Sequence, residues 1–150
     1  MIKKILIGLV ILLIILAIGF WAWKSSQRNT PVATINGETF SLYVAESVKD
    51  KQIGLSKYDE LEDKRGMIFA FDKPDYYSFW MKSMKFPIDI IFINKDKIVT
   101  IHKNVSPPEE NQELNVYISD EPADKVIEIK AGASDKYSFK EGDTVTLSNI

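Results

Sequence analysis

The sequence contains no cysteine, and His102 is the single histidine among its 150 residues. The absence of cysteine excludes disulfides, thiolate metal sites, iron–sulfur clusters and lipid attachment through an N-terminal cysteine. One imidazole alone does not make a zinc site, and we therefore predict no metal and no cofactor. The net charge of −2 provides no strong field, so we expect no nucleic-acid partner.

What the sequence has instead is one long uncharged run near its N-terminus. Residues 1–4 are a basic start, and residues 5–23 carry no charge. A helix of that length spans roughly 28 Å, close to the hydrocarbon thickness of a bilayer. Trp21 and Trp23 stand at its far end, where amphipathic rings favour the membrane interface. The run predicts a single transmembrane anchor over residues 5–23, a linker over residues 24–31 and a soluble domain over residues 32–150.

A cleaved signal peptide is the alternative interpretation of this run. The run is longer than a usual signal-peptide core, and no pair of small residues marks a cleavage site after it. Lys3 and Lys4 on one side balance Lys24 and Arg28 on the other, so charge leaves the orientation open. Because the segment resembles an export signal, we predict a cell-membrane protein whose soluble domain faces outside the cytoplasm.

The remaining sequence alternates short apolar runs with turn signals, which is typical of a mainly β fold. Asn36-Gly37 predicts a tight hairpin turn, and a second turn is predicted over residues 94–97. One short helix is predicted over residues 47–53, with Ser47 as its N-cap and Gly54 at its end. Residues 72–75 are expected to form a turn after a short strand, residues 67–71. Many short strands with little helix indicate a compact β-sandwich or a squat barrel.

The densest apolar and aromatic stretch outside the N-terminus covers residues 66–93 and has three apolar blocks, at residues 66–69, 79–82 and 87–93. These blocks contain two charged residues, Lys82 and Asp89. An aspartate among apolar residues must be paired, hydrogen-bonded or protonated, because an isolated buried charge is costly. The structural interpretation is a Lys82–Asp89 ion pair, or Asp89 capping backbone N–H groups of the turn at residues 84–86. The functional interpretation is a polar cleft for a ligand.

Several blocks of this region, taken together, resemble the family catalogued as domain of unknown function 192. The resemblance covers about residues 32–147 and rests on Gly54-Leu55, Leu61, Gly66-Met67-Ile68-Phe69, Phe79-Trp80-Met81-Lys82, Pro87-Ile88-Asp89-Ile90-Ile91-Phe92, Glu128 with Ala131-Gly132, and Gly142-Asp143. It implies a compact β-sandwich of jelly-roll type, and members that are often exported or membrane-anchored; it implies no activity, substrate or cofactor. The sequence departs from the family pattern at Tyr58, where an arginine is usual, and it has prolines in place of a loop cysteine that some members carry.

Four residues are candidates for a ligand-binding site: Trp80, Lys82, Asp89 and Glu128. Trp80 and Lys82 lie on the strand face opposite Phe79 and Met81, so if that pair faces the core, Trp80 and Lys82 face elsewhere. For Glu128 the structural alternative is a solvated sheet edge. Met67, Met81 and Met84 beside Trp80 are consistent with a thioether site for Cu(I), but we favour core packing, because methionine fills gaps beside aromatic rings.

Three functions remain open from the sequence. The leading hypothesis is a membrane-anchored, non-catalytic binding or accessory module whose ligand is a small molecule, a glycan or a protein. The second is a hydrolase of an envelope polymer that uses Asp89 and Glu128 for acid–base chemistry. The third is a structural domain for protein interaction.

Overall fold

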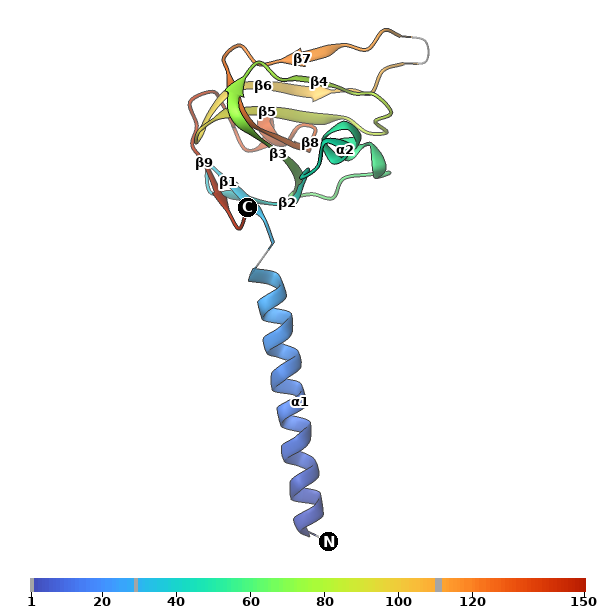
Figure 1. Cartoon of the computed structure of the whole chain (residues 1–150), viewed down its shortest axis with the longest axis vertical. Coiled ribbons are helices and arrows are strands. Elements are labelled where there is room, and N and C mark those ends of the chain that lie inside the picture. The colour runs from blue at the N-terminus through green and yellow to red at the C-terminus, as the bar shows by residue number, and fades with distance from the viewer. Residues whose placement is uncertain (1, 29, 110–111) are drawn as a thin grey trace. The chain divides into compact units, whose positions relative to one another are not determined.

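The computed structural model describes residues 2–28, 30–109 and 112–150. Its first element is helix α1, Ile2–Arg28, which covers the predicted anchor and the first part of the predicted linker (Figure 1). From Val10 to Trp23 the large apolar side chains of α1 are all more than half exposed. Within the described part of the chain, no helix is both long and apolar enough to cross a membrane. The side chains of residues 5–7 and 9, which belong to the predicted anchor, lie outside the described part.

Residues 31–148 form a compact unit of their own, which is mainly β. Its elements in chain order are β1 Val32–Ile35, β2 Glu38–Val44, α2 Val48–Ile53, the 3-10 turn η1 Gly54–Lys57, β3 Arg65–Asp75, β4 Ser78–Trp80, β5 Ile88–Asn94, β6 Lys97–Val105, β7 Val116–Ile118, β8 Ala123–Lys130, α3 Ala133–Lys136 and β9 Val145–Ser148. This confirms the predicted mainly β class with little helix.

Seven of the strands pair into one curled sheet in the order β6-β5-β8-β3-β2-β1-β9 (Figure 1). All pairs are antiparallel except β2 with β3, which run parallel because α2 and η1 carry the chain across between them. The remaining two strands, β4 and β7, pair with each other as a separate ribbon. The pairing therefore gives a single large sheet and a ribbon, and it does not confirm the predicted sandwich.

The central strands of the sheet are apolar on both faces, and each face packs its own core cluster. On β5, every residue from Ile88 to Ile93 is buried. Ile91 and Ile93 join one cluster with Ile68, Ile127, Ile129 and Phe139, whereas Ile88, Ile90 and Phe92 join the other with Met67, Phe69, Met81 and Val126. Burial on both faces is typical of a central strand, and it means that neighbouring residues of β5 and β8 face two different environments.

Local sequence signals place the turns and the short helix as predicted. Asn36 and Gly37 both have positive φ and join β1 to β2, as a two-residue hairpin turn requires. Ser47 caps α2: its hydroxyl accepts a hydrogen bond from the Asp50 N–H at 3.1 Å, and the Asp50 carboxylate accepts from the Ser47 N–H at 3.1 Å. Gly54, at φ 53°, ends the helix.

The predicted turn over residues 72–75 is wrong, because β3 continues through it to Asp75. The register between β3 and β8 shifts between Ala70 and Asp75, so the strand is irregular there and accommodates Pro74 without a regular ladder. The longer strand carries the chain out to Tyr77 and then into β4. This extension brings β4 back over the sheet near Phe69 and Phe71.

Candidate functional site

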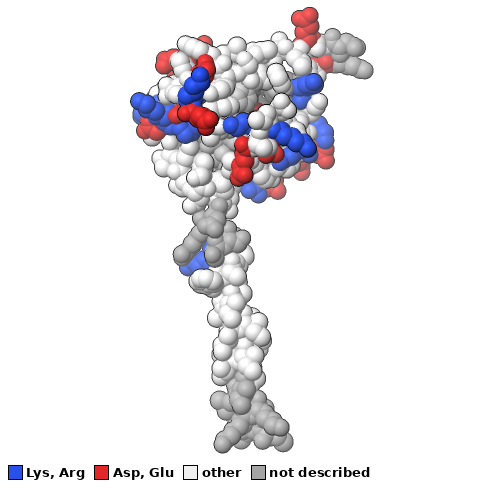
Figure 2. All heavy atoms as spheres, in the orientation of Figure 1, with Lys and Arg blue, Asp and Glu red and all other residues white. Residues whose placement is uncertain are grey.

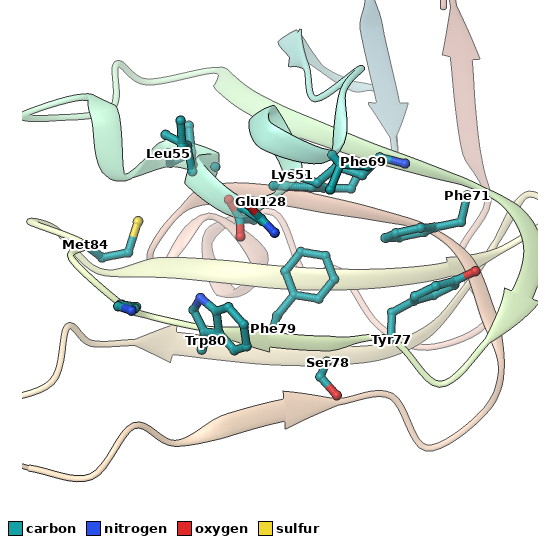
Figure 3. A pocket seen from close by; sticks show the side chains of 15 residues that line it. Lys51, Leu55, Phe69, Phe71, Tyr77, Ser78, Phe79, Trp80, Met84 and Glu128 are labelled. Atoms are coloured by element: carbon teal, nitrogen blue, oxygen red, sulfur yellow. The ribbon is translucent and has the colours of Figure 1, made fainter.

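A pocket of about 250 Å³ lies between α2 and η1 on one side and β4 on the other, with β3 and β8 beneath (Figure 3). Its walls are mostly apolar and aromatic, and the charged residues among them are Lys51, Lys82 and Glu128. We call it the Glu128 pocket; it is lined by Val48, Lys51, Gln52, Ile53, Gly54, Leu55, Phe69, Phe71, Tyr77, Ser78, Phe79, Trp80, Lys82, Met84 and Glu128.

Glu128 projects into this pocket from the middle of the sheet. Strand β8 pairs with β3 and β5, and Glu128 stands opposite Met67 on one and Ile90 on the other. Its apolar neighbours leave the residue only 6% exposed, so the predicted solvated edge is wrong. Its Oε2 atom is buried, and among the described residues it has no hydrogen-bond partner.

Burial raises the pKa of the Glu128 carboxyl from 4.5 to about 8. Desolvation is the one cause of this shift, because removing a carboxylate from water disfavours its charged form. Lys51 and Lys82 line the same pocket without lowering the pKa of this group. Glu128 is therefore mostly protonated at pH 7, and no basic side chain among the described residues forms an ion pair with it.

Gly54 leaves open the space in front of this carboxyl. A Cβ atom added at Gly54 would stand 3.9 Å from Glu128 Oε2 and 3.5 Å from Phe69 Cζ. The positive φ of Gly54 is also a conformation that favours glycine. The end of α2 thus approaches the carboxyl with backbone alone, and a side chain here would occupy part of the pocket.

Aromatic rings form the wall opposite α2. Phe79 packs edge-on against Phe69, with ring centroids 5.0 Å apart, and against Phe92 at 5.6 Å. Trp80, the next residue, is 49% exposed. Because Phe79 and the buried Met81 face the core, Trp80 and Lys82 point elsewhere, as the strand pattern predicts. At one end of the pocket, the rings of Phe71 and Tyr77 stack, with their centroids 3.6 Å apart.

The two lysines at the pocket differ in what they contact. Lys51 donates a hydrogen bond to the Ala70 carbonyl, and its Nζ lies 4.6 Å from the centroid of the Phe71 ring. Lys51 therefore closes the end of the pocket at which Phe71 and Tyr77 stack. Lys82 is exposed, and no ion pair holds it among the described residues.

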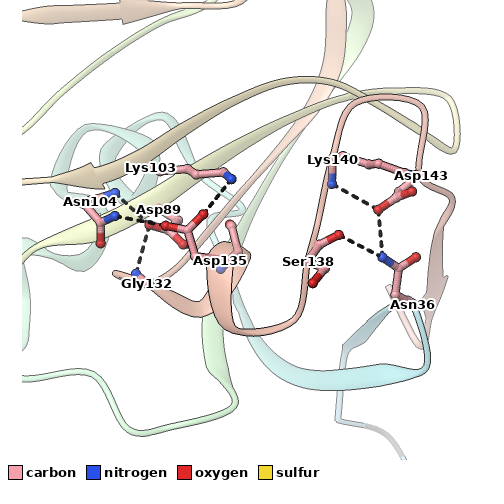
Figure 4. Close-up of polar contacts among 10 residues, drawn as sticks. Asn36, Asp89, Lys103, Asn104, Gly132, Asp135, Ser138, Lys140 and Asp143 are labelled. Atoms are coloured by element: carbon pink, nitrogen blue, oxygen red, sulfur yellow. Dashed lines mark hydrogen bonds and ion pairs between the residues drawn. The ribbon is translucent and has the colours of Figure 1, made fainter.

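Asp89 lies on the opposite face of the sheet from this pocket. Ile90 is paired with Glu128, so Asp89, one residue earlier, projects to the other side together with its own partner Ile129. Its buried carboxylate accepts three backbone hydrogen bonds, from the N–H groups of Asn104 (2.8 Å), Gly132 (3.1 Å) and Ser134 (2.8 Å) (Figure 4).

Asp89 is thus a structural capping residue for the end of β6 and the start of α3. The predicted capping of backbone N–H groups is present, but at residues 104, 132 and 134 instead of the expected turn at residues 84–86. The alternative Lys82–Asp89 ion pair is not formed, because Lys82 borders the pocket on the other side of the sheet.

Of the four candidate residues, the structure brings together Trp80, Lys82 and Glu128 and leaves Asp89 apart. His102 Nε2 donates to the Ile118 carbonyl at 2.9 Å and joins β6 to β7, away from the pocket lining. Met67 and Met81 are buried in the core cluster, while Met84 lines the pocket. No group of three or more metal-ligating histidine or acidic side chains occurs in the part of the chain that the structure describes.

The sequence-based prediction missed the contribution of α2 and η1, which supply Lys51, Gly54 and Leu55. It also missed Phe71, which stacks on Tyr77 at one end of the pocket. Gly54-Leu55 was visible as a motif, but nothing local indicated that it faces Glu128, which is 74 positions later in the chain.

A family model for domain of unknown function 192, described as an uncharacterised ACR, matches residues 31–147. The chain belongs to this family. No curated protein matches it. In this DUF192 domain, Tyr58 at the usual arginine position stacks on Tyr43, with ring centroids 4.7 Å apart, and is not among the residues that line the pocket.

Two solved structures resemble the chain. One is a protein of unknown function from Novosphingobium aromaticivorans, with 31% sequence identity, a TM-score of 0.69, and coverage of 77% of this chain and 83% of that chain. The other, from Sinorhizobium meliloti, is named provisionally as a transcription regulator; it has 25% identity, a TM-score of 0.70, and coverage of 81% and 97%. The family and these neighbours establish the kind of domain and leave its function open.

Proposed function

We propose that this DUF192 domain is a non-catalytic module that binds a small ligand in the Glu128 pocket. The observation that carries the proposal is the buried carboxyl inside an apolar, aromatic cavity, with an oxygen atom that has no hydrogen-bond partner in the described part of the chain. Such a group costs stability unless something completes its hydrogen bonds, and groups of this kind gather at functional sites. A pocket with apolar walls and few polar groups is the usual form of a small-molecule site, and its volume suits a ligand smaller than a typical drug.

The proposal assigns a role to each candidate residue that the pocket contains. Trp80 and Phe79 supply flat apolar surface, Glu128 meets a polar group of the ligand, and Lys82 stands at the rim. Figure 3 shows the Glu128 side chain between the α2 segment and the rings of Phe79 and Trp80. Phe79 and Trp80 belong to β4 and Glu128 belongs to β8, so the pocket depends on how these two strands pack together.

The geometry does not support the hydrolase that would use Asp89 and Glu128. Acid–base cleavage of a glycosidic bond places two carboxyl groups on either side of that bond. Here the two carboxyl groups project from opposite faces of one sheet, and Glu128 is the single carboxyl group among the residues that line the pocket. We likewise propose no nucleic-acid role, because acidic and basic side chains are mixed on the face shown in Figure 2. The domain also contains surface ion pairs, such as Lys130 with Asp63 at 2.7 Å.

A screen of small apolar compounds with one polar group tests this function. We expect at least one compound to bind the full chain, and Trp80→Ala to weaken that binding about tenfold, as the loss of one partly buried large side chain implies. Tyr76→Ala is the matched control, because Tyr76 is exposed and is not a lining residue. Binding is measured by ligand-observed NMR. The absence of any binding, or equal binding to the Trp80→Ala variant, contradicts the proposal and favours a structural interaction domain.

The proposal also includes attachment to the cell membrane through residues 5–23, with the domain outside the cytoplasm. Its support is the run without charge and the exposed apolar side chains of α1. We expect the full chain to remain with membranes after an alkaline wash, and a chain that starts at residue 30 not to do so. Protease added to intact cells, after removal of any wall, should digest the domain. Recovery of the full chain in the soluble fraction, or of a product cut after residue 23, contradicts the anchor.

A further inference from the structure

We infer that the ligand of the Glu128 pocket is a small organic ammonium ion with an aromatic or branched apolar body. In this arrangement the ammonium group pairs with the Glu128 carboxylate, and the apolar body lies against the rings of Phe79 and Trp80. The inference rests on the proposed function, and it specifies the chemical class of the ligand.

The pocket combines one carboxyl group with aromatic walls. Phe69, Phe79 and Trp80 line the pocket around Glu128. The faces of aromatic rings carry negative partial charge and attract cations, most strongly where water is excluded. The pocket end already holds one ammonium group in this way, since Lys51 Nζ lies 4.6 Å from the Phe71 ring centroid.

An anionic ligand would not complete the hydrogen bonds of the buried Glu128 carboxyl group. Its charged group would pair with Lys51 or with Lys82, the two basic residues that line the pocket, and an anionic group offers no hydrogen-bond donor to Glu128. The buried Oε2 atom would then remain without a partner. An ammonium group supplies hydrogen-bond donors to that oxygen and compensates its charge.

Binding of a cation in this pocket is coupled to the protonation of Glu128. The other titratable groups that line the pocket are Lys51 from α2, Tyr77 before β4 and Lys82 after it. The neighbours of Glu128 on β3 and β5, Met67 and Ile90, do not titrate. Burial raises the pKa of Glu128 to about 8, so the need to ionise this group at pH 7 lowers the affinity for a cation only about tenfold. A charge-assisted hydrogen bond between the cation and the carboxylate can compensate for this loss. Binding of a cation must therefore release one proton from Glu128 below pH 8.

The test uses three probes that share a phenyl ring and a short chain: phenethylamine, 2-phenylethanol and 3-phenylpropionate. Binding to the full chain is measured by calorimetry between pH 6 and 8.5, where the amine stays charged. We expect the amine to bind most tightly, with an affinity that rises about tenfold per pH unit from pH 6 to 7.5 and levels off above pH 8. Repeating the titration in buffers of different ionisation enthalpy should show close to one proton released at pH 6.5.

Glu128→Gln should remove this pH dependence and weaken amine binding at least tenfold at pH 8. Glu141→Gln is the matched control, because Glu141 is exposed and lies outside the pocket, and it should behave as the unmodified chain does. If Glu128→Gln binds the amine with the same affinity and pH dependence, the inference is overturned. Tighter binding of the alcohol or the acid than of the amine, sensitive to Trp80→Ala, overturns the inference and leaves the proposed function standing. Failure of all three probes overturns the inference, and failure of the wider screen as well overturns the proposed function.

Discussion

Replacing Asp89 with alanine is expected to lower the free energy of unfolding by about 3–5 kcal/mol. The carboxylate is fully buried and accepts hydrogen bonds from three backbone N–H groups, at Asn104, Gly132 and Ser134. Each buried N–H donor left without an acceptor costs about 1–3 kcal/mol. Water that enters the space of the lost side chain can accept some of these hydrogen bonds, so the total cost is smaller than the sum over the three donors. Urea unfolding of the full chain in mild detergent, followed by circular dichroism of the strands, measures the loss.

Asp135 provides the control for this experiment. It lies near Asp89 and pairs with Lys103 at 2.7 Å, but its side chain is 58% exposed. An exposed ion pair contributes little, so Asp135→Ala should have a much smaller effect than Asp89→Ala. Asp89→Asn should fall between wild type and Asp89→Ala, because the amide keeps one accepting oxygen but turns an NH₂ group toward a donor. If Asp89→Ala is as stable as wild type, the capping role assigned to Asp89 is incorrect.

Glu128→Gln is expected to become more stable relative to the unmodified chain as the pH rises. The difference in unfolding free energy between the two proteins should favour the variant by roughly 3–5 kcal/mol more at pH 8–9 than at pH 4.5. The pKa of Glu128 is raised from 4.5 to about 8 by burial, so between these values the folded state holds a proton that the unfolded state has lost. The contribution of Glu128 to the free energy of unfolding is therefore fully present below pH 4.5. It is lost as the pH rises to about 8, at about 1.4 kcal/mol per pH unit. Glutamine does not ionise, so it removes that loss.

The measurement is the difference in unfolding free energy between the two proteins at several pH values, since the other titrating groups then cancel. Glu141→Gln serves again as the control and should show a difference that does not change with pH. A constant difference between Glu128→Gln and wild type from pH 5 to 9 would mean that Glu128 is ionised in the folded state.

The fold was most predictable where a signal is local. Asn36-Gly37 determines a hairpin turn because both residues must adopt positive φ, and Ser47 with Asp50 determines the start of α2. The strand after Met67 was less predictable: Pro74 favours a turn, but the irregular register past Ala70 lets β3 continue. The parallel pairing of β2 with β3 follows from the path of α2 and η1, which no local pattern reports.

For the site, the sequence identifies Trp80, Lys82 and Glu128 but cannot separate them from Asp89. Within one strand, alternation shows which residues share a face; it does not show which face of β5 corresponds to which face of β8. That depends on the pairing of Ile90 with Glu128, and a shift of one residue would have exchanged the environments of Asp89 and Ile90. The approach of Gly54 to Glu128 is likewise a result of tertiary packing.

The pairing of the first strand with the last has a consequence for the modularity of this domain. In the ladder between β1 and β9, Val32 stands directly opposite Ser148. The chain therefore enters and leaves the domain at neighbouring positions, separated by about the 5 Å between adjacent strands. A domain with this geometry can be inserted into a surface loop of a host protein, or circularly permuted by a short joining loop, without distortion of the sheet.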